Sequence, residues 1–183
     1  KELLENAVDA GASQITVEIR NGGVDLIRIV DNGHGMGRDD ATLCLQRHAT
    51  SKLRAIDDLN SLDTLGFRGE ALPSIASVSR FSIRTREPGA LGAIRVSVEG
   101  GENLQVVDAA GPVGTEIIVE DLFFNVPARR KFLKTQATEA SHVQELVQRI
   151  ALCYPNIAVR FIKDGRQAQD YPAASGLQER AGA

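Results

Sequence analysis

Two short segments of alternating apolar and polar residues, joined by a tight turn, constrain the fold of this chain most strongly. Residues 15–20 and 25–31 both show the period of two that is typical of strands with one buried face. The residues between them include Asn21, Gly22 and Gly23, which favour a hairpin turn. The pattern therefore predicts a pair of adjacent antiparallel strands near the start of the chain.

The remaining elements extend this pattern into a mixed fold. Further strands are predicted at about 80–86, 92–99, 104–107, 115–121 and 157–162, and helices at about 1–10, 38–47, 69–76 and 139–153. Hairpin strands and helices follow one another without a steady strand–helix–strand repeat. We therefore expect an α/β (α+β) fold in two layers, a mixed, largely antiparallel sheet with helices on one face. The doubly wound nucleotide-binding fold is disfavoured for the same reason.

Composition limits the class of protein. The 183 residues, 43% hydrophobic and 25% charged, fit an ordinary soluble domain with a sizeable core. We expect this domain to span residues 1–166, and residues 167–183 to form its end and the start of a linker. No apolar run approaches the roughly 20 residues of a membrane span, and no signal peptide opens the chain. A cytoplasmic protein without a membrane partner is expected.

Charge and cysteine content exclude further classes. The net charge of −3 does not make the whole surface attractive to nucleic acid, and two distant cysteines argue against a disulfide scaffold. Basic residues nevertheless gather within six positions, at Arg129, Arg130, Lys131 and Lys134. This cluster fits either contact with DNA phosphates or a solvated basic loop, and the residues alone leave both interpretations open.

The predicted first helix carries a stripe of polar side chains. Glu2, Asn6 and Asp9 are spaced so that they share one side of the helix, and apolar residues flank them. Buried carboxylates are costly unless they are paired or put to use. The stripe therefore needs a partner, such as a metal-bound phosphate and a water molecule.

A second group of candidate residues ends the second strand. Asp31 shares the strand face that helices are expected to cover, so its carboxylate must accept a hydrogen bond from a buried donor, for which the amino group of a purine would serve. Gly33 and Gly35 would let a flat ring approach the backbone, although a plain glycine-rich turn explains them equally well. The spacing is not that of a dinucleotide loop, because position 38 is Arg, and no Gly-Lys pair forms a Walker A motif.

Three further segments carry residue types suited to phosphates or to a ring. Glycines that bracket the start of a helix expose backbone N–H groups, hydroxyls with an ammonium group suit phosphate, and a buried strand hydroxyl needs a ring nitrogen or a water. Taken alone, each has an ordinary explanation as a helix start, a solvated loop or a strand residue. The candidates are Gly66, Phe67, Arg68 and Gly69; Thr50, Ser51 and Lys52; and Thr115.

In this order, the motifs resemble those of the GHKL ATPases, a superfamily that contains type II topoisomerase subunits, Hsp90 chaperones, histidine kinases and MutL mismatch-repair proteins. The motifs are Glu-x₃-Asn at 2–6, Asp-x-Gly-x-Gly at 31–35, Gly-Phe-Arg-Gly-Glu-Ala at 66–71 and Gly-Thr at 114–115. Within the superfamily the chain is similar to MutL, on blocks at 47–52, 66–72 and 125–133. The alternative is another member, a topoisomerase subunit or an Hsp90-like protein.

The resemblance implies the GHKL (Bergerat) ATP-binding fold and a role for each residue of the stripe and the second strand. Glu2 would be the general base that activates water, and Asn6 would bind Mg²⁺ through its amide oxygen. Asp31 would accept from the adenine amino group, Gly33 and Gly35 would shape the pocket, and Thr115 would help to hold the ring. Spacing leaves the role of Asp9 unassigned.

The resemblance also implies where the phosphates lie. Lys52 and the backbone around Arg68 and Gly69 would receive them, and residues 49–68 would form a lid over ATP. MutL proteins begin with an N-terminal arm and continue into a second domain that supplies a lysine, a linker and a dimerisation domain. We therefore expect this chain to be a fragment with slow hydrolysis.

The implied biological role is an ATP-gated dimeric clamp that couples mismatch recognition to strand removal. Its partners would be ATP with Mg²⁺, DNA, a mismatch-recognition protein, a downstream nuclease or helicase, and a second copy of the full-length protein. Two interpretations of this role remain open. The protein is either an enzyme whose purpose is ATP hydrolysis or a switch whose purpose is nucleotide-gated interaction.

Overall fold

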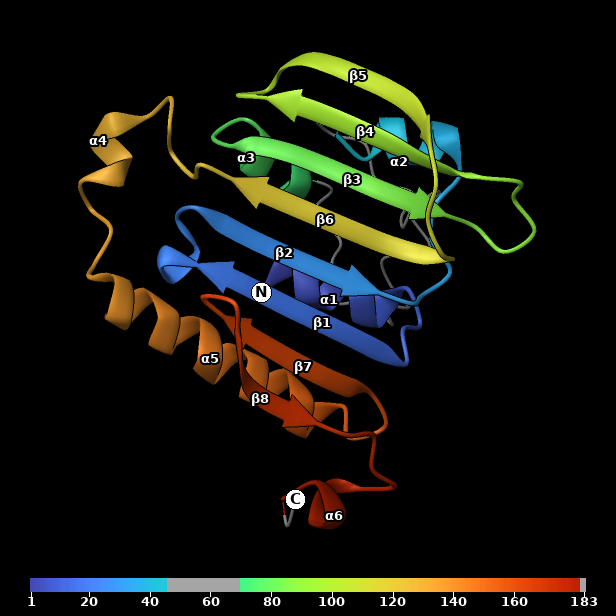
Figure 1. Cartoon of the computed structure of the whole chain (residues 1–183), viewed down its shortest axis with the longest axis vertical. Coiled ribbons are helices and arrows are strands. Elements are labelled where there is room, and N and C mark those ends of the chain that lie inside the picture. Colours follow the sequence, from blue (N-terminus) through green and yellow to red (C-terminus); the bar gives the residue numbers. More distant parts are fainter. Residues whose placement is uncertain (46–69, 182–183) are drawn as a thin grey trace, which may run out of the picture.

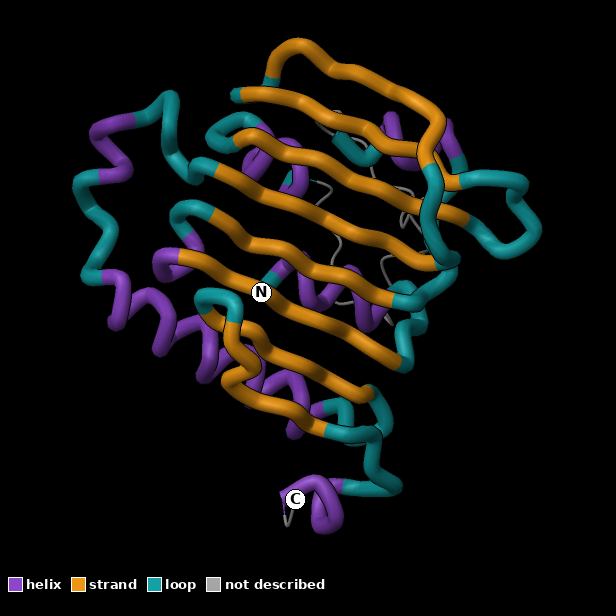
Figure 2. The backbone as a smooth tube through the Cα atoms, in the orientation of Figure 1, coloured by secondary structure: helices purple, strands orange, loops and turns teal. Residues whose placement is uncertain are grey.

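A mixed sheet organises the part of the chain that the computed structural model describes, residues 1–45 and 70–181. These residues form eight strands in the order β5-β4-β3-β6-β2-β1-β7-β8 (Figures 1 and 2). Every neighbouring pair is antiparallel except β1 and β7, which are parallel. The strands are β1 (Gln14–Arg20), β2 (Leu26–Asp31), β3 (Arg80–Arg86), β4 (Ala93–Glu99), β5 (Glu102–Ala109), β6 (Gly114–Glu120), β7 (Ala158–Lys163) and β8 (Arg166–Tyr171).

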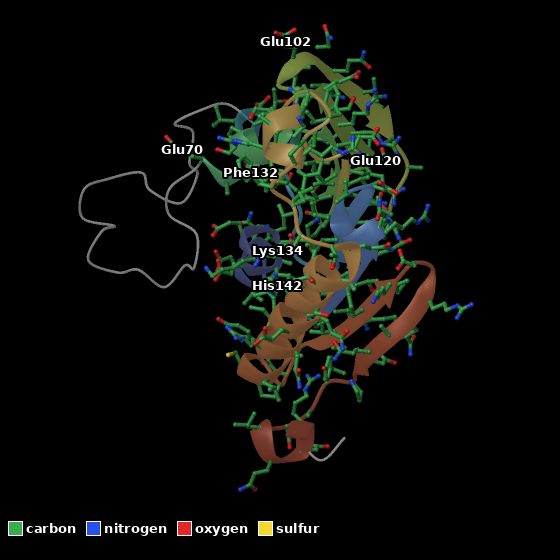
Figure 3. All side chains as sticks on the ribbon, turned by 90° about the vertical axis from the view of Figure 1, so that its left-hand side faces the viewer. Glu70, Glu102, Glu120, Phe132, Lys134 and His142 are labelled. Atoms are coloured by element: carbon green, nitrogen blue, oxygen red, sulfur yellow. The ribbon has the colours of Figure 1, made fainter. Side chains whose placement is uncertain are left out.

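The main helices lie on one face of this sheet. Figures 1 and 3 show α1, α2, α3 and α5 on the same side, and none of the described helices covers the other side. The helices are α1 (Glu2–Asp9), α2 (Arg38–Leu43), α3 (Ala71–Ala76), α4 (Pro127–Arg130), α5 (Gln136–Cys153) and α6 (Leu177–Ala181), with a 3₁₀ turn, η1 (Asn21–Gly23). The expected two-layer fold is confirmed. Within the described residues, no helix combines the length and the apolar character needed to cross a membrane.

The core lies between the sheet and these helices, as the alternation in the sequence predicts. Ile15, Val17 and Ile19 of β1 point into it and are buried, as are Leu4 of α1 and Val147 of α5. Burying such side chains stabilises the fold by about 1.5–3 kcal/mol each. The outward residues of the same strand, at positions 16, 18 and 20, are polar or charged, so only one face of β1 can seat a helix.

A ladder of alternating charges ties four strands together on the helix-free face. Arg20 of β1 contacts Glu18 at 3.1 Å, and Arg28 of β2 contacts Glu18 at 3.3 Å. Arg28 also contacts Glu116 of β6 at 2.7 Å, and Arg84 of β3 reaches the same carboxylate at 2.9 Å. The carboxylates of Glu18 and Glu116 are nearly buried, so their arginine partners compensate for the loss of hydration. The ladder fixes the strands whose other face carries the candidate site.

Several boundaries differ from the sequence prediction. The hairpin turn between β1 and β2 lies at Asn21, Gly22 and Gly23 as predicted, where it forms the 3₁₀ turn η1 with all three residues at positive φ. The helix expected at 38–47 ends at Leu43, and its expected continuation runs into residues that the structure does not describe. Three further elements, α4, β8 and α6, were not predicted from the sequence. The outer strand β8 has the polar sequence RQAQDY and is largely exposed, so it gives no alternating signal.

Candidate functional site

The first helix presents its apolar side to the sheet and its polar stripe away from it. Leu3, Leu4 and Ala7 are buried, while Asn6 and Asp9 are half-buried, in agreement with the predicted stripe. The side chain of Glu2 is 50% accessible, so the burial expected of the stripe does not extend to this carboxylate, which can reach bulk water from the first turn. A carboxylate in this position suits contact with a reacting water better than a role in the core.

A glycine ends this helix and turns the chain into β1. Gly11 has φ +69, and its N–H donates to the Val8 carbonyl at 2.9 Å, while the Ala12 N–H donates to the Ala7 carbonyl at 3.2 Å. These two bonds are those of a Schellman motif, which satisfies the last helix carbonyls. The helix predicted at about residues 1–10 is therefore observed, with its end at this glycine.

The loop after β2 packs directly on the end of the first helix. The His34 N–H donates to the Ala10 carbonyl at 2.9 Å. A Cβ on Gly33 would lie 2.6 Å from the same carbonyl oxygen, so only glycine fits beside the helix end. The Asn32 Oδ1 accepts from the backbone N–H groups of Ser13 and Gln14 at 2.9 and 2.8 Å. The loop and the helix, distant in sequence, thus form one site.

Asp31 ends β2 within this junction and is half-buried. Burial raises the pKa of its carboxyl, while hydrogen bonds from the backbone N–H groups of Gly33 and Thr115 act in the opposite direction. The Gly33 N–H lies 2.9 Å from Oδ1. Burial has the larger effect, so the carboxylate is held in a site where another donor would stabilise its charge.

Two threonine hydroxyls lie beside Asp31 across the neighbouring strands of the sheet. In the sheet register Asp31 lies opposite Thr115 of β6, which lies opposite Thr85 of β3. The Oγ1 atoms of Thr85 and Thr115 are 3.1 Å apart, and both residues are buried. The inward position of Thr115 agrees with the predicted alternation. Thr85 was not among the residues predicted from the sequence, although it occupies the inward position after Phe81 and Ile83 in the same period-two pattern.

The glycines of the loop after β2 allow its backbone to lie close to the backbone of neighbouring elements. Gly35 has φ +67, and a Cβ there would overlap the carbonyl oxygen of Arg86 at the end of β3. The neighbouring Met36 N–H donates to Thr85 Oγ1 at 2.9 Å, which ties the loop to β3. Contact between Gly33 or Gly35 and a bound ring stays a prediction.

Gly35→Ala is expected to destabilise the protein by about 2 kcal/mol or more, because left-handed strain and backbone overlap coincide at this position. Chemical denaturation would measure the change. Gly165→Ala is the matched control, since Gly165 also has a positive φ, +78, but nothing lies within 4 Å of an added Cβ. Equal losses in the two variants would show that the close approach to Arg86 contributes nothing.

Part of the predicted site lies outside the described residues. This holds for the proposed lid, residues 49–68, and for all the candidate phosphate contacts. These are Thr50, Ser51, Lys52, Gly66, Phe67, Arg68 and Gly69. The description resumes at Glu70, immediately before α3, so the site is observed as the α1–β2–β6–β3 junction.

The described residues do not form an all-protein metal centre. Within residues 1–45 and 70–181 there is no group of three or more His, Cys, Asp or Glu side chains that could hold a metal ion. The half-buried amide of Asn6, one turn from Glu2, offers a single neutral oxygen. Such a donor suits Mg²⁺ that takes its other ligands from phosphates and water.

The basic cluster is remote from this junction. Figure 1 shows α4 beyond one end of the sheet, whereas β2 and β3 finish at the opposite end. All four basic side chains are exposed, and Phe132 between them is 86% exposed. Figure 3 shows Phe132 and Lys134 on the side that faces the viewer, which is the left-hand side of Figure 1. These residues therefore do not line the candidate site.

Most of the candidate site lies within a stretch of the chain that matches a known protein family. Residues 1–112 match the family model of histidine kinase-, DNA gyrase B- and HSP90-like ATPases. The match includes α1, β2, β3 and the loop after β2, but ends just before Gly114 and Thr115.

Similar proteins and solved structures point to one branch of this family. The DNA mismatch repair protein MutL of Syntrophobacter fumaroxidans is 52% identical over 182 residues, which cover 100% of the chain and 27% of that protein. MutL of Myxococcus xanthus is 58% identical over 157 residues, covering 86% and 25%. The Aquifex aeolicus MutL ATPase domain complexed with ADP is 36% identical with a TM-score of 0.77, covering 98% and 64%. The chain thus spans about a quarter of the length of these curated relatives.

Proposed function

The chain belongs to the histidine kinase-, DNA gyrase B- and HSP90-like ATPases, within them to the MutL family of mismatch-repair proteins, and we propose that its α1–β2–β6–β3 junction binds and hydrolyses ATP. The observation that carries this proposal is Asp31, a half-buried carboxylate of raised pKa held between Gly33 and Thr115. Such a group gains most from a buried donor, and the adenine amino group is one.

Residues of the first helix account for water activation and metal binding in this proposal. Glu2 is exposed on the first turn and acts as the general base that orients and deprotonates the attacking water. Asn6 lies one turn further on and would hold Mg²⁺ through its amide oxygen, and the bound ion would offset phosphate charge. Asp9, half-buried on the same stripe, supports this arrangement from the last turn.

The triphosphate extends from this helix toward residues outside the described part. Thr50, Ser51 and Lys52 supply hydroxyls and an ammonium group, and the backbone around Arg68 and Gly69 supplies N–H groups. Residues 49–68 would then act as the lid. The support for these contacts is the residue types and their resemblance to the family's motifs.

A calorimetric titration of the chain with a non-hydrolysable ATP analogue and Mg²⁺ tests the proposed binding. We expect saturable binding of one nucleotide per chain, weakened when EDTA removes the metal, because Asn6 and the phosphates share it. A titration without measurable heat at millimolar nucleotide, repeated with a fluorescent analogue to the same result, would contradict the proposal.

For the whole protein we propose a cytoplasmic, ATP-gated homodimeric clamp in DNA mismatch repair. It would act between a mismatch-recognition protein and a downstream nuclease or helicase. The names of the relatives support the repair role, and their identities of 52% and 58% favour it over a topoisomerase subunit or an Hsp90-like protein. Slow hydrolysis that rises when DNA is added would support a switch, whereas fast, DNA-independent turnover would support a plain enzyme.

A further inference from the structure

A single hydroxyl, that of Thr85, connects three parts of the candidate site. Its Oγ1 lies 2.9 Å from the Met36 backbone nitrogen, 3.1 Å from the Gly114 carbonyl oxygen and 3.1 Å from Thr115 Oγ1. Thr85 is 1% exposed, so water does not compete for these bonds. Its hydroxyl therefore links the loop after β2 to the start of β6.

The donors and acceptors around Thr85 fix the direction of each bond. A threonine hydroxyl has one hydrogen to donate and two lone pairs that accept. The Met36 N–H can only donate, and the Gly114 carbonyl can only accept. Thr85 therefore gives its hydrogen to Gly114 and accepts from Met36, and its second lone pair faces Thr115. All three bonds form together only when Thr115 donates to Thr85.

The consequence appears on the ligand side of Thr115. Because its hydrogen is committed to Thr85, the Thr115 oxygen has only lone pairs left for a bound molecule. Its neighbour across the register is Asp31, whose carboxylate also accepts hydrogen bonds. Two adjacent acceptors favour a ligand edge that carries N–H groups, directly or through a donating water, and oppose an edge that carries an oxygen lone pair.

We propose that Thr85 is a positioning residue that holds Thr115 as a hydrogen-bond acceptor and so makes the site select 6-amino over 6-keto purine nucleotides. The inference rests on the proposed nucleotide-binding function and adds a determinant of base specificity to it. Adenine presents its amino group to both acceptors. Hypoxanthine presents a carbonyl oxygen in the same place and leaves a buried acceptor unpaired, which sites of this kind reject.

Removing the Thr85 hydroxyl releases the hydrogen of Thr115. In Thr85→Val, which keeps the shape of the side chain, Thr115 can turn its hydrogen toward a 6-keto oxygen. In Thr85→Ser the hydroxyl and all three of its bonds are retained. The two variants thus separate the hydrogen-bonding role of Thr85 from its packing in the core.

The test is calorimetric titration of the full chain with ATP and with ITP, each in the presence of Mg²⁺. We expect the ratio of the ITP to the ATP dissociation constant to fall about three- to tenfold in Thr85→Val, the effect of one hydrogen bond. The ratio should keep its wild-type value in Thr85→Ser. It should also be unchanged in Thr16→Val, a control on the helix-free face of β1.

A purely structural role of Thr85 gives a different result. Loss of the hydrogen bonds to Met36 and Gly114 would then weaken the binding of both nucleotides in parallel. The ratio of the ITP to the ATP dissociation constant would stay within about twofold of wild type, and this result would overturn the inference. If circular dichroism shows that Thr85→Val does not fold, Thr115→Val removes the acceptor itself and must lower the same ratio; an unchanged ratio there overturns the inference equally. A wild-type chain that binds neither nucleotide instead refutes the proposed function, and the inference with it.

Discussion

Replacing Glu2 with alanine is expected to slow ATP hydrolysis at least about tenfold while leaving ATP affinity nearly unchanged, because positioned general bases contribute about 10²- to 10⁴-fold to rate. The side chain of Glu2 is half-accessible on the first turn of α1, outside the core, so its loss should not disturb the fold. Steady-state phosphate release measures turnover, and titration with a non-hydrolysable analogue measures binding.

Two further variants sharpen this experiment. Glu2→Gln keeps the shape of the side chain but cannot accept the proton, so it should be as slow as the alanine variant. Glu145→Ala changes a partly exposed glutamate on α5, paired with Arg149 at 2.6 Å, and should hydrolyse at the wild-type rate. Undiminished turnover in purified Glu2→Ala would rule out Glu2 as the base.

Asp31→Asn is expected to weaken ATP binding by about tenfold or more, the effect of losing a hydrogen bond to a charged acceptor. The asparagine oxygen can still accept from Gly33 and Thr115, so the loop should stay in place. Titration with the ATP analogue measures the loss, and hydrolysis at saturating ATP should change much less. If Asp31→Asn binds ATP as tightly as the wild type, the adenine contact is assigned to the wrong residue.

Asp31→Asn is also expected to affect folding stability, and not in the unfavourable direction of its effect on ATP binding, because the pKa of Asp31 is raised. Burial makes the folded carboxyl hold its proton more tightly than the unfolded chain does, so the folded state loses stability as pH rises through the folded pKa. At neutral pH the free Asp31→Asn protein should therefore be at least as stable as wild type in urea denaturation. On acidification, ATP affinity of the wild type should fall at a higher pH than an ordinary aspartate would predict, and an affinity that falls no earlier than for an ordinary aspartate would contradict this assignment.

Periodicity predicted the inner strands well because their residues alternate between a core and a charged face. Residues 80–86 were predicted as a strand with the bounds that β3 has, and β1 differs by one residue. The edge strand β8 was missed because it is largely exposed and its polar sequence shows no alternation. The expected division after residue 166 stays a prediction, although β8 extends the sheet past that point.

The sequence singled out the polar residues at the end of β2 and the start of β6, but not the contacts that support them. Asp31 and Thr115 were singled out because a buried polar group needs a partner, and the sheet brings them together. Asn32 and Thr85 were not, because their roles depend on backbone groups of Ser13, Gln14, Met36 and Gly114, which residue types do not reveal. The contact of Gly33 with a ring stays a prediction, and the structure adds that the missing side chain of Gly33 lets the loop lie against the end of α1.

The most direct test of the central claim, that Asp31 reads the adenine of bound ATP, is a crystal structure of the chain with Mg²⁺ and a non-hydrolysable ATP analogue. The adenine amino group should lie within about 3.2 Å of an Asp31 carboxylate oxygen, with the phosphates beside Asn6 on the polar stripe of α1. A nucleotide bound elsewhere, such as on the helix-free face of the sheet near Arg84 and Glu116, with Asp31 bonded only to Gly33 and Thr115, would contradict it.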